Sequence, residues 1–152
     1  MSTRYDIISD THGYLSPELL AQLEGADVIV HAGDICSSSD YRKLRSIAPL
    51  QLCLGNNDYA YDYGPEVRDV VRFFSSGLRW QLCHYRRRLD LTTCDIAIFG
   101  HTHTPVLEHD PNSGVLVMNP GSPTYPRRSR TSMGRIICED GKILSAEIIT
   151  LE

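Results

Sequence analysis

The stretch that decides the predicted fold is YDIISDTHG, residues 5–13. Its first four residues form a short segment with two β-branched residues, and polar residues follow at once, which is typical of a buried strand. Asp10 and His12 then end the strand in a polar loop. Apolar residues at helical spacing come next, with Ser16 as the expected N-cap of a helix. A buried strand that leads through a polar loop into a helix indicates the first unit of a parallel sheet.

The same unit repeats further along the chain. Residues 27–30 predict a second strand and residues 50–54 a third, and apolar residues at helical spacing lie between them. We expect this second helix to begin at Ser39 or Asp40 and to end before Pro49. Alternation of strands and helices with short links predicts parallel strands joined by right-handed crossovers.

The second half of the chain has a different pattern, because strands succeed one another with turn residues between them. The predicted strands cover residues 70–74, 79–83, 96–99, 106–107, 115–118, 134–138 and 143–150. We expect them to form a second, largely antiparallel sheet that packs on the first. Since no linker or repeat divides the sequence, the prediction is one α/β domain over residues 1–152.

Composition narrows the function classes. The 152 residues are about the length of one ordinary domain, and 15 Lys and Arg against 19 Asp and Glu give a net charge of −4. A stable nucleic-acid complex is not expected, because phosphate-backbone binding usually leaves a basic excess. No apolar run approaches the ~20 residues that span a bilayer, so no membrane partner is expected. Five cysteines, an odd number, favour a reduced protein in the cytoplasm.

The informative pattern lies in the polar residues at which the strands end. Five strands end in residues with metal-ligating side chains: Asp10, His12, Asp34, Asn56, His84, His101 and His103. In α/β sheets, ligand sites lie beyond the carboxyl ends of the strands. Carboxylate, amide and imidazole ligands without thiolate suit Mn, Fe or Zn.

Seven such side chains are too many for one tetrahedral site and suit two ions that share a carboxylate. Paired ions ~3.5–4 Å apart can hold the attacking and leaving oxygens of a phosphoryl displacement. Glycines at 13, 33, 55 and 100 are expected to let the backbone turn tightly between the ligands. Any one of these short motifs alone is more typical of an ordinary turn, and it is their joint occurrence in order that indicates a metal site.

The same residues stand in blocks that resemble a known family. SDTHG at 9–13, GD at 33–34, GNND at 55–58 and GHTH at 100–103, together with His84, resemble the signature of calcineurin-like metallophosphoesterases. A later block, NPGSP at 119–123, precedes a Pro-Arg pair and resembles the small YfcE-like phosphodiesterase branch. That branch also includes the retromer scaffold subunit.

The resemblance implies a fold and a set of ligands. The fold would be a four-layer sandwich, in which two packed mixed β-sheets are flanked by helices. One ion would be held by Asp10, His12, Asp34 and His103, and the other by Asp34, Asn56, His84 and His101. Asp34 would bridge the two divalent ions, with Mn expected first and Zn, Fe or Ni as alternatives. In this family a hydroxide that bridges the ions attacks phosphorus.

Two departures from the family pattern concern the substrate. Many members place a His directly after the metal-binding Asn, where it protonates the leaving group, but this chain has Asn57. An amide is no general acid, so we expect a preference for activated leaving groups. Asp58 either orients Asn57 or a water, or is an ordinary turn residue.

The second departure comes after His84, where the family commonly continues with Gly-His and this chain has Tyr-Arg-Arg-Arg. Sixteen residues up to Gly100 leave little room for a crossover helix. Arg86, Arg87 and Arg88 either bind substrate phosphate or form a solvated face. Arg127 is the better candidate for contacting an anionic substrate.

The sequence therefore predicts a metal-dependent phosphoesterase that acts on a small phosphate ester, as a phosphodiesterase in preference to a phosphomonoesterase. The alternative is a metal-binding scaffold of the same fold, similar to the retromer subunit. A dinucleotide-binding domain is excluded, because the loop after the first strand is SDTHG and is not glycine-rich. Monomer and homo-oligomer both fit this composition.

Overall fold

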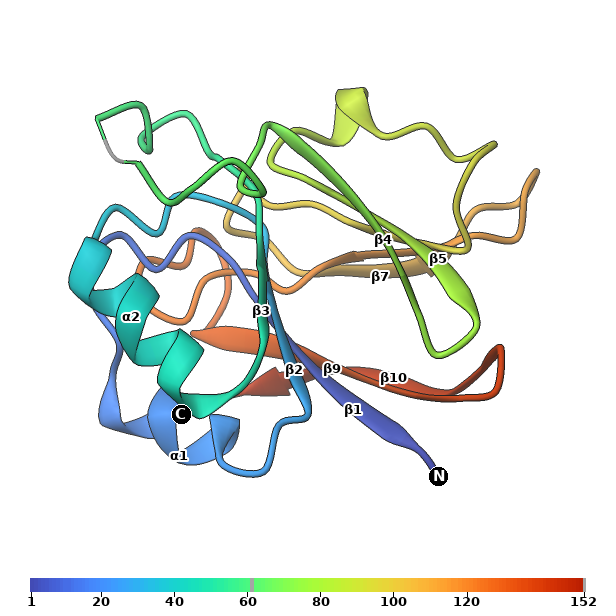
Figure 1. Cartoon of the computed structure of the whole chain (residues 1–152), viewed down its shortest axis with the longest axis horizontal. Coiled ribbons are helices and arrows are strands. Elements are labelled where there is room, and N and C mark those ends of the chain that lie inside the picture. Colours follow the sequence, from blue (N-terminus) through green and yellow to red (C-terminus); the bar gives the residue numbers. More distant parts are fainter. Residues whose placement is uncertain (61, 152) are drawn as a thin grey trace.

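The computed structural model describes residues 1–60 and 62–151. The described strands form two sheets of five, which pack face to face (Figure 1). The first sheet has the order β10-β9-β1-β2-β3, with bounds β1 (Thr3–Ile8), β2 (Val28–His31), β3 (Leu50–Leu52), β9 (Ser132–Glu139) and β10 (Lys142–Thr150). The second has the order β4-β5-β6-β8-β7, with bounds β4 (Val70–Ser75), β5 (Leu78–Cys83), β6 (Ile96–Ile98), β7 (Val106–His109) and β8 (Leu116–Asn119). This confirms the predicted sandwich of two mixed sheets.

Helices α1 (Pro17–Leu23) and α2 (Ser38–Ile47) connect the parallel strands β1, β2 and β3. Ser16 caps α1 as predicted, since its side chain accepts a hydrogen bond from the backbone N–H of Leu19 at 3.1 Å. The predicted start of α2 is wrong. Its cap is Ser37, whose Oγ accepts from the backbone N–H of Asp40, so the helix begins earlier than Ser39.

The predicted composition of the second sheet is also wrong. Strands β9 and β10 belong to the first sheet, where β9 pairs antiparallel with β1. The physical reason is that Tyr5 to Ile8 of β1 are all buried, so this strand needs hydrogen-bonding partners on both sides. The remaining second sheet is half parallel, because the connection through residues 84–95 returns β6 parallel to β5.

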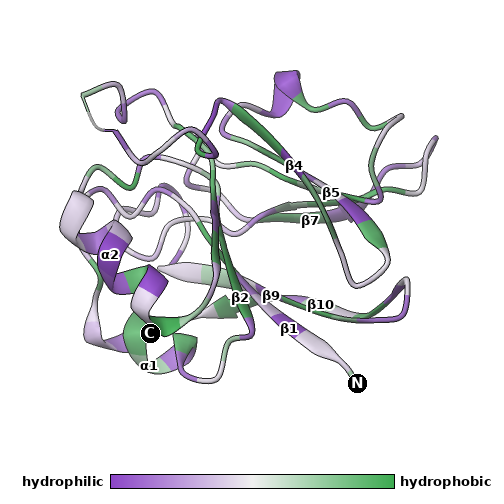
Figure 2. Ribbon diagram, in the orientation of Figure 1, coloured by the Kyte–Doolittle hydropathy of each residue, from purple (hydrophilic) through white to green (hydrophobic). Residues whose placement is uncertain are grey.

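The main core lies between the two sheets. The Trp80 ring stacks on Phe73 with ring centroids 5.4 Å apart and lies 4.4 Å from Tyr5 of the opposite sheet. A second cluster, which includes Leu19, Leu23 and Leu44, lies under the two α-helices. Figure 2 shows hydrophobic residues along the strands where the sheets face each other.

The outer face of the second sheet is covered by the segment that connects β5 to β6. Phe99 and its buried neighbours pack against Leu89 and Leu91 of the connecting segment 84–95. In this segment the structure contains a short 3-10 turn, η1 (Arg86–Arg88), and no α-helix, as the sixteen-residue spacing predicts. Figure 1 shows both α-helices on the side of the first sheet. The fourth layer is therefore a loop segment rather than helices.

The loops after the predicted metal-binding strands meet at one end of the sandwich. The backbone N–H of Asp10 donates to the carbonyl of Gly33, and that of Gly100 donates to the carbonyl of His84. His101 joins the two sheets there, because its backbone N–H donates to the Asp10 carboxylate at 3.0 Å. Within the described part of the chain, no helix is long and apolar enough to cross a membrane.

Candidate metal centre

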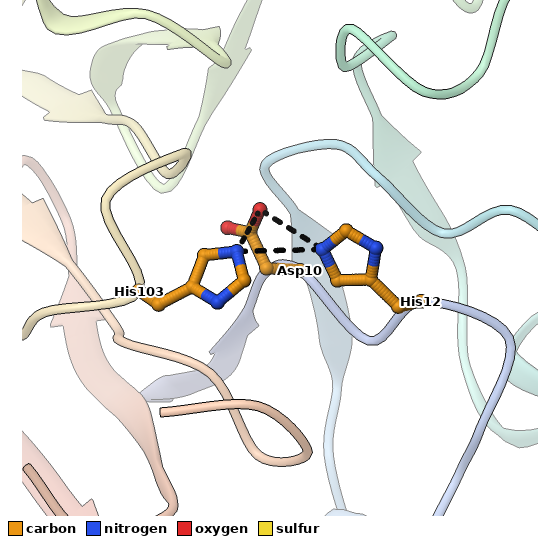
Figure 3. A group of neighbouring side chains, drawn as sticks. All are labelled: Asp10, His12 and His103. Atoms are coloured by element: carbon orange, nitrogen blue, oxygen red, sulfur yellow. Dashed lines mark hydrogen bonds and ion pairs between the residues drawn. The ribbon is translucent and has the colours of Figure 1, made fainter. Parts of the chain in front are cut away.

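A first group of three side chains comes from two loops that are far apart in sequence. Figure 3 shows the Asp10 carboxylate between the rings of His12 and His103. Asp10 Oδ1 lies 3.2 Å from His103 Nε2 and 3.7 Å from His12 Nε2, and the two Nε2 atoms are 3.3 Å apart. Neighbouring ligands of one ion with bonds of ~2.0–2.2 Å have about this spacing. The group can therefore hold a metal ion.

A second group shares Asp10 with the first and adds Asp34 and His84. His84 Nε2 lies 3.4 Å from Asp34 Oδ2 and 3.7 Å from Asp10 Oδ1. Asp34 Oδ2 is also 3.7 Å from His12 Nε2, so this oxygen lies between the two groups. That position is compatible with the bridging role predicted for Asp34, and the Asp10 carboxylate is shared in the same way.

The rings of two histidines are held with one nitrogen facing the cluster. The Nδ1 atoms of His84 and His103 lie 2.7 Å and 2.5 Å from the carbonyl oxygens of Ala32 and Tyr125, which makes Nδ1 the protonated nitrogen. The Nε2 lone pairs are then free for a ligand, as in metal sites where the second ring nitrogen donates to a carbonyl.

Two buried atoms at this place, Asp10 Oδ1 and His84 Nε2, have no hydrogen-bond partner among the residues that the structure describes. An unpaired buried acceptor costs about 1–3 kcal/mol, so such atoms call for an explanation. Both atoms belong to the cluster around Asp10 and Asp34, and both are good ligands for a divalent cation. The residues present therefore fit the metal ions that the family resemblance implies.

Several of the predicted ligands share a strained backbone conformation. Five of the predicted ligands have φ in the left-handed region: Asp10 at 56°, His12 at 50°, Asp34 at 61°, His101 at 72° and His103 at 61°. Left-handed backbone costs non-glycine residues of order 1–3 kcal/mol and persists where the surrounding structure holds it. Its concentration on the clustered residues indicates that the strain serves to direct these side chains inward.

Electrostatics also favour a bound cation. Burial raises the pKa of Asp10, but the neighbouring imidazoles of His103 and His12 outweigh burial, so the pKa lies well below its usual value. The pKa of Asp34 is lowered likewise, because His84 and Asn57 outweigh burial. Both carboxylates are thus ionised at neutral pH, which is the form that binds a metal ion.

The pKa values of the histidines beside these carboxylates shift in the opposite direction. The pKa of His103 is raised, first by the Asp10 carboxylate beside its Nε2. Burial lowers the pKa of His84, but Asp34 and Asp10 outweigh it and the net shift is upward. Metal binding would have to displace these ring protons, so affinity should fall at acid pH.

The two other predicted ligands lie at the edge of the cluster. His101 Nδ1 is 3.2 Å from Asn56 Oδ1, and the His101 ring lies edge-on to His84 with centroids 5.1 Å apart. Asn56 is exposed, unlike the buried Asp34. The structure thus places this pair next to His84, on the side where the resemblance puts the second ion, while His103 joins the first group.

The two residues predicted to have catalytic roles have different surroundings. Asn57 donates twice to Asp34, from its backbone N–H at 2.8 Å and from its side-chain amide at 2.9 Å. Asp58 is buried, and its carboxylate accepts from the backbone N–H groups of Asp34, Cys36 and Gly55 at 2.8–2.9 Å. Asp58 therefore ties the loops after β2 and β3 together and does not orient Asn57.

Cys36 lies beside the cluster without joining it. Its Sγ is 4.0 Å from His12 Nδ1, and Cys36 forms a third possible metal group with Asp34 and Asp58. Burial, with the charges of Asp58 and Asp34, raises the pKa of the Cys36 thiol to about 12. A neutral thiol and a carboxylate already occupied by three N–H groups make this third group a poor metal site.

The arginines predicted to contact substrate lie in different surroundings. Arg127 is exposed, and its charge contributes to lowering the pKa of His101, after the larger effects of burial and of His84. Arg86 forms an ion pair with Glu108, and the guanidinium of Arg87 lies 4.5 Å from the centre of the Tyr85 ring. None of these contacts brings Arg86 or Arg87 to the clustered ligands.

Several residues that shape the cluster have no individual role predicted from the sequence. Ser9 Oγ donates to Asp10 Oδ2 at 2.6 Å, and Ser122 Oγ donates to the Asp10 carbonyl at 2.8 Å. Asn119 donates to the Gly100 carbonyl at 3.0 Å. Ser122 and Asn119 belong to the NPGSP block, which the sequence analysis singled out as a family motif. Their hydrogen bonds to distant parts of the chain could not be predicted from that motif.

Two of the predicted glycines serve close approach rather than a special turn. A Cβ at Gly55 would lie 2.1 Å from Asp34 Oδ1, and one at Gly100 would lie 2.1 Å from Ser9 Oγ. Neither has positive φ, unlike Gly13 and Gly33. At these two positions the neighbouring polar side chains leave no room for a Cβ.

Comparisons with known proteins agree with this geometry. The family model of the calcineurin-like phosphoesterase superfamily domain matches residues 4–141. A protein described as "Probable metallophosphoesterase" in Methanocaldococcus jannaschii is 30% identical over 158 aligned positions, covering 96% of this chain and 80% of that protein.

Two solved structures share the fold. Vacuolar protein sorting 29 from Cryptosporidium parvum has a TM-score of 0.76 at 20% identity, over 98% of both chains. An archaeal phosphodiesterase has a TM-score of 0.74 at 22% identity, over 97% of this chain and all of that one. The chain therefore belongs to the calcineurin-like phosphoesterase superfamily, as its sequence blocks predict.

Proposed function

We propose that this protein is a metal-dependent phosphodiesterase that uses two divalent ions bound at the ends of β1, β2, β3, β5 and β6. The observation that carries the proposal is the buried cluster in which Asp10 and Asp34 are both shared between His12 and His84. Two ions bound there would supply Lewis-acid charge to the phosphoryl oxygens and lower the pKa of water.

The residues of the chain have separable tasks in this proposal. Asp10 and Asp34 provide ionised carboxylates between the two groups of histidines, and Asn57 fixes the orientation of Asp34 through two hydrogen bonds. Ala32 and Tyr125 hold the rings of His84 and His103 through their carbonyl oxygens. Because these supports are built into the fold, the ligands need little rearrangement when ions bind.

Preference for diesters rests on the resemblance of the NPGSP block and on the phosphodiesterase among the solved structures of this fold. Mn²⁺ is the first candidate ion, because the donors are carboxylate, amide and imidazole without thiolate. The substrate would be a small phosphate ester. A cytoplasmic location would suit the five free cysteines.

A non-catalytic scaffold is the competing function, since a vacuolar sorting protein has the same fold. That scaffold would bind metal as well, so the buried ligand atoms Asp10 Oδ1 and His84 Nε2 fit both functions. Metal-dependent turnover is the property that separates the two functions.

Hydrolysis of bis(p-nitrophenyl) phosphate tests the proposal. The protein is stripped with a chelator and resupplied with Mn²⁺, Zn²⁺, Fe²⁺ or Mg²⁺, and p-nitrophenyl phosphate is assayed in parallel. We expect at least one ion to restore turnover, with the diester preferred. Asp34→Asn should lose more than about 100-fold, since even residues that only support a ligand cost 10–100-fold.

Asp140→Asn is the matched control, because Asp140 is an exposed residue in the turn between β9 and β10 and is not one of the predicted ligands. It should retain full activity. Folded protein that hydrolyses neither substrate with any ion would favour the scaffold, and activity that survives in Asp34→Asn would exclude the bridging role.

A further inference from the structure

A small cavity lies directly beside the candidate metal centre. It has a volume of about 160 Å³, and its lining includes Asn56 and His84, two of the predicted ligands. Residues Leu54 and Gly55 form another part of the wall, together with the ring of Tyr85. At ~30 Å³ for each water molecule, the space equals about five waters, enough for one substituent of a phosphate ester. A phosphate held at the metal centre could extend one of its ester groups into this cavity.

Arg88 and Asp69 also line the cavity, from different segments of the chain. Arg88 Nη1 lies 3.6 Å from Asp69 Oδ2. The exposed fraction is 47% for the Arg88 side chain and 67% for the Asp69 side chain. That separation exceeds the 2.7–3.2 Å of a hydrogen bond, so the pair is held by charge alone. Exposed ion pairs of this kind contribute about 0–1 kcal/mol. An anionic group that enters the cavity can therefore compete with Asp69 for the guanidinium.

The short turn η1 gives its three arginines different surroundings. Arg86 is paired with Glu108 and lies over the ring of Phe99. Arg87 lies over the ring of Tyr85. Arg88 lines the cavity, whereas Arg86 and Arg87 do not. The turn thus delivers one positive charge to the edge of the metal centre, and the ion pair of that charge with Asp69 is weak.

We propose that this cavity binds one ester group of the substrate and that Arg88 recognises a second anionic group on it, a carboxylate or a phosphate. The inference rests on the proposed phosphodiesterase function and narrows its substrates to diesters with an additional negative charge. A guanidinium suits this task because it offers planar, paired N–H donors to carboxylate and phosphate oxygens.

The test compares three substrates that release the same p-nitrophenolate. They are the phenyl, 4-carboxyphenyl and 4-phosphonophenyl p-nitrophenyl phosphate diesters. The measured quantity is the ratio of kcat/KM for each charged diester to that for the uncharged phenyl diester. In the wild-type protein we expect a ratio of about ten or more, the size of one added charge-assisted hydrogen bond. The anion with the larger ratio identifies the preferred group.

Arg88→Met should bring the ratio close to one, and Arg88→Lys should keep part of it, because a lysine retains the charge without the paired donors. Arg86→Met is the matched control. It removes the same charge from the same turn, but Arg86 does not line the cavity, so the wild-type ratio should persist.

The failures are distinguishable. If the wild-type protein releases nitrophenolate from none of the diesters with any ion, the proposed function fails and this inference fails with it. If it hydrolyses them but shows no preference for the charged diesters, or if Arg88→Met and Arg86→Met lower the ratio equally, the function stands and Arg88 has no part in recognition.

Discussion

At the scale of single residues, we expect Asn57 to limit which esters the site can cleave. Its amide is bonded to Asp34 and has no proton to give a leaving group. General acid catalysis is typically worth about 10²–10⁴-fold, and its loss affects poor leaving groups most. We therefore expect kcat to fall steeply as the pKa of the leaving phenol rises across a series of aryl diesters.

Asn57→His should flatten this dependence by gaining most, at least about tenfold, on the poorest leaving group. The same variant should gain little on bis(p-nitrophenyl) phosphate, whose leaving group needs no proton. A slope that is equal in both proteins would show that position 57 does not face the leaving group.

His31 gives a second prediction at this scale, for stability against pH. It is fully buried, with Nδ1 accepting from the backbone N–H of Gly33 and Nε2 bonded to Thr11 Oγ1. Burial lowers the pKa of His31 from 6.5 to about 3. Below pH 6.5 His31 is protonated in the unfolded chain but stays neutral in the folded chain. The free energy of unfolding should therefore fall as the pH drops from 6.5 towards 3, by about 1.4 kcal/mol per pH unit.

His31→Gln removes this titration and keeps a donor and an acceptor in the side chain. Urea unfolding of chelator-treated protein should give a curve of stability against pH that is shallower for the variant between pH 6.5 and 4. Parallel curves for the two proteins would mean that His31 is protonated in the folded state.

At the scale of elements, Asp6 joins two strands and a helix. It is fully buried on β1 and accepts hydrogen bonds from Arg4 at 2.8 Å and from Arg135 of β9 at 2.8 Å. Arg135 also donates to the carbonyl of Gln22 in α1 at 2.9 Å. The network fixes the sheet whose strand ends carry Asp10 and Asp34.

Asp6→Ala leaves two partly buried guanidinium groups without their carboxylate, which should cost about 3 kcal/mol of unfolding free energy. Chemical denaturation measures this loss. Glu108→Ala breaks the exposed pair with Arg86 and should cost less than about 1 kcal/mol. Equal losses in the two variants would mean that the Asp6 network adds nothing beyond a surface ion pair.

At the scale of the whole molecule, the sequence predicts local features well and distant contacts poorly. The candidate ligands could be selected because they follow predicted strands, and the cap of α1 could be predicted because Ser16 stands at the start of an apolar pattern with helical spacing. The pairing of β9 with β1 could not be predicted from the sequence, since it depends on which distant strand forms hydrogen bonds with the buried edge of β1.

The same limit applies to the site. The hydrogen bond from Ser122 to Asp10 joins residues 112 positions apart, and no spacing rule indicates it. The cavity beside Asn56 likewise depends on where η1 packs, so the three arginines of that turn could not be told apart in the sequence. Their different partners became visible only in the folded chain.

If the ends of these strands hold two divalent ions, as we propose, the number of metal ions bound to each chain should be two. Chelator-treated protein is dialysed to equilibrium against Mn²⁺, and the bound metal is measured by mass spectrometry alongside Asp34→Asn. We predict two ions for each wild-type chain and one or none for the variant, since Asp34 Oδ2 lies between His12 and His84. One ion or fewer in the folded wild-type protein, or two in Asp34→Asn, would contradict the claim of two ions bridged by Asp34.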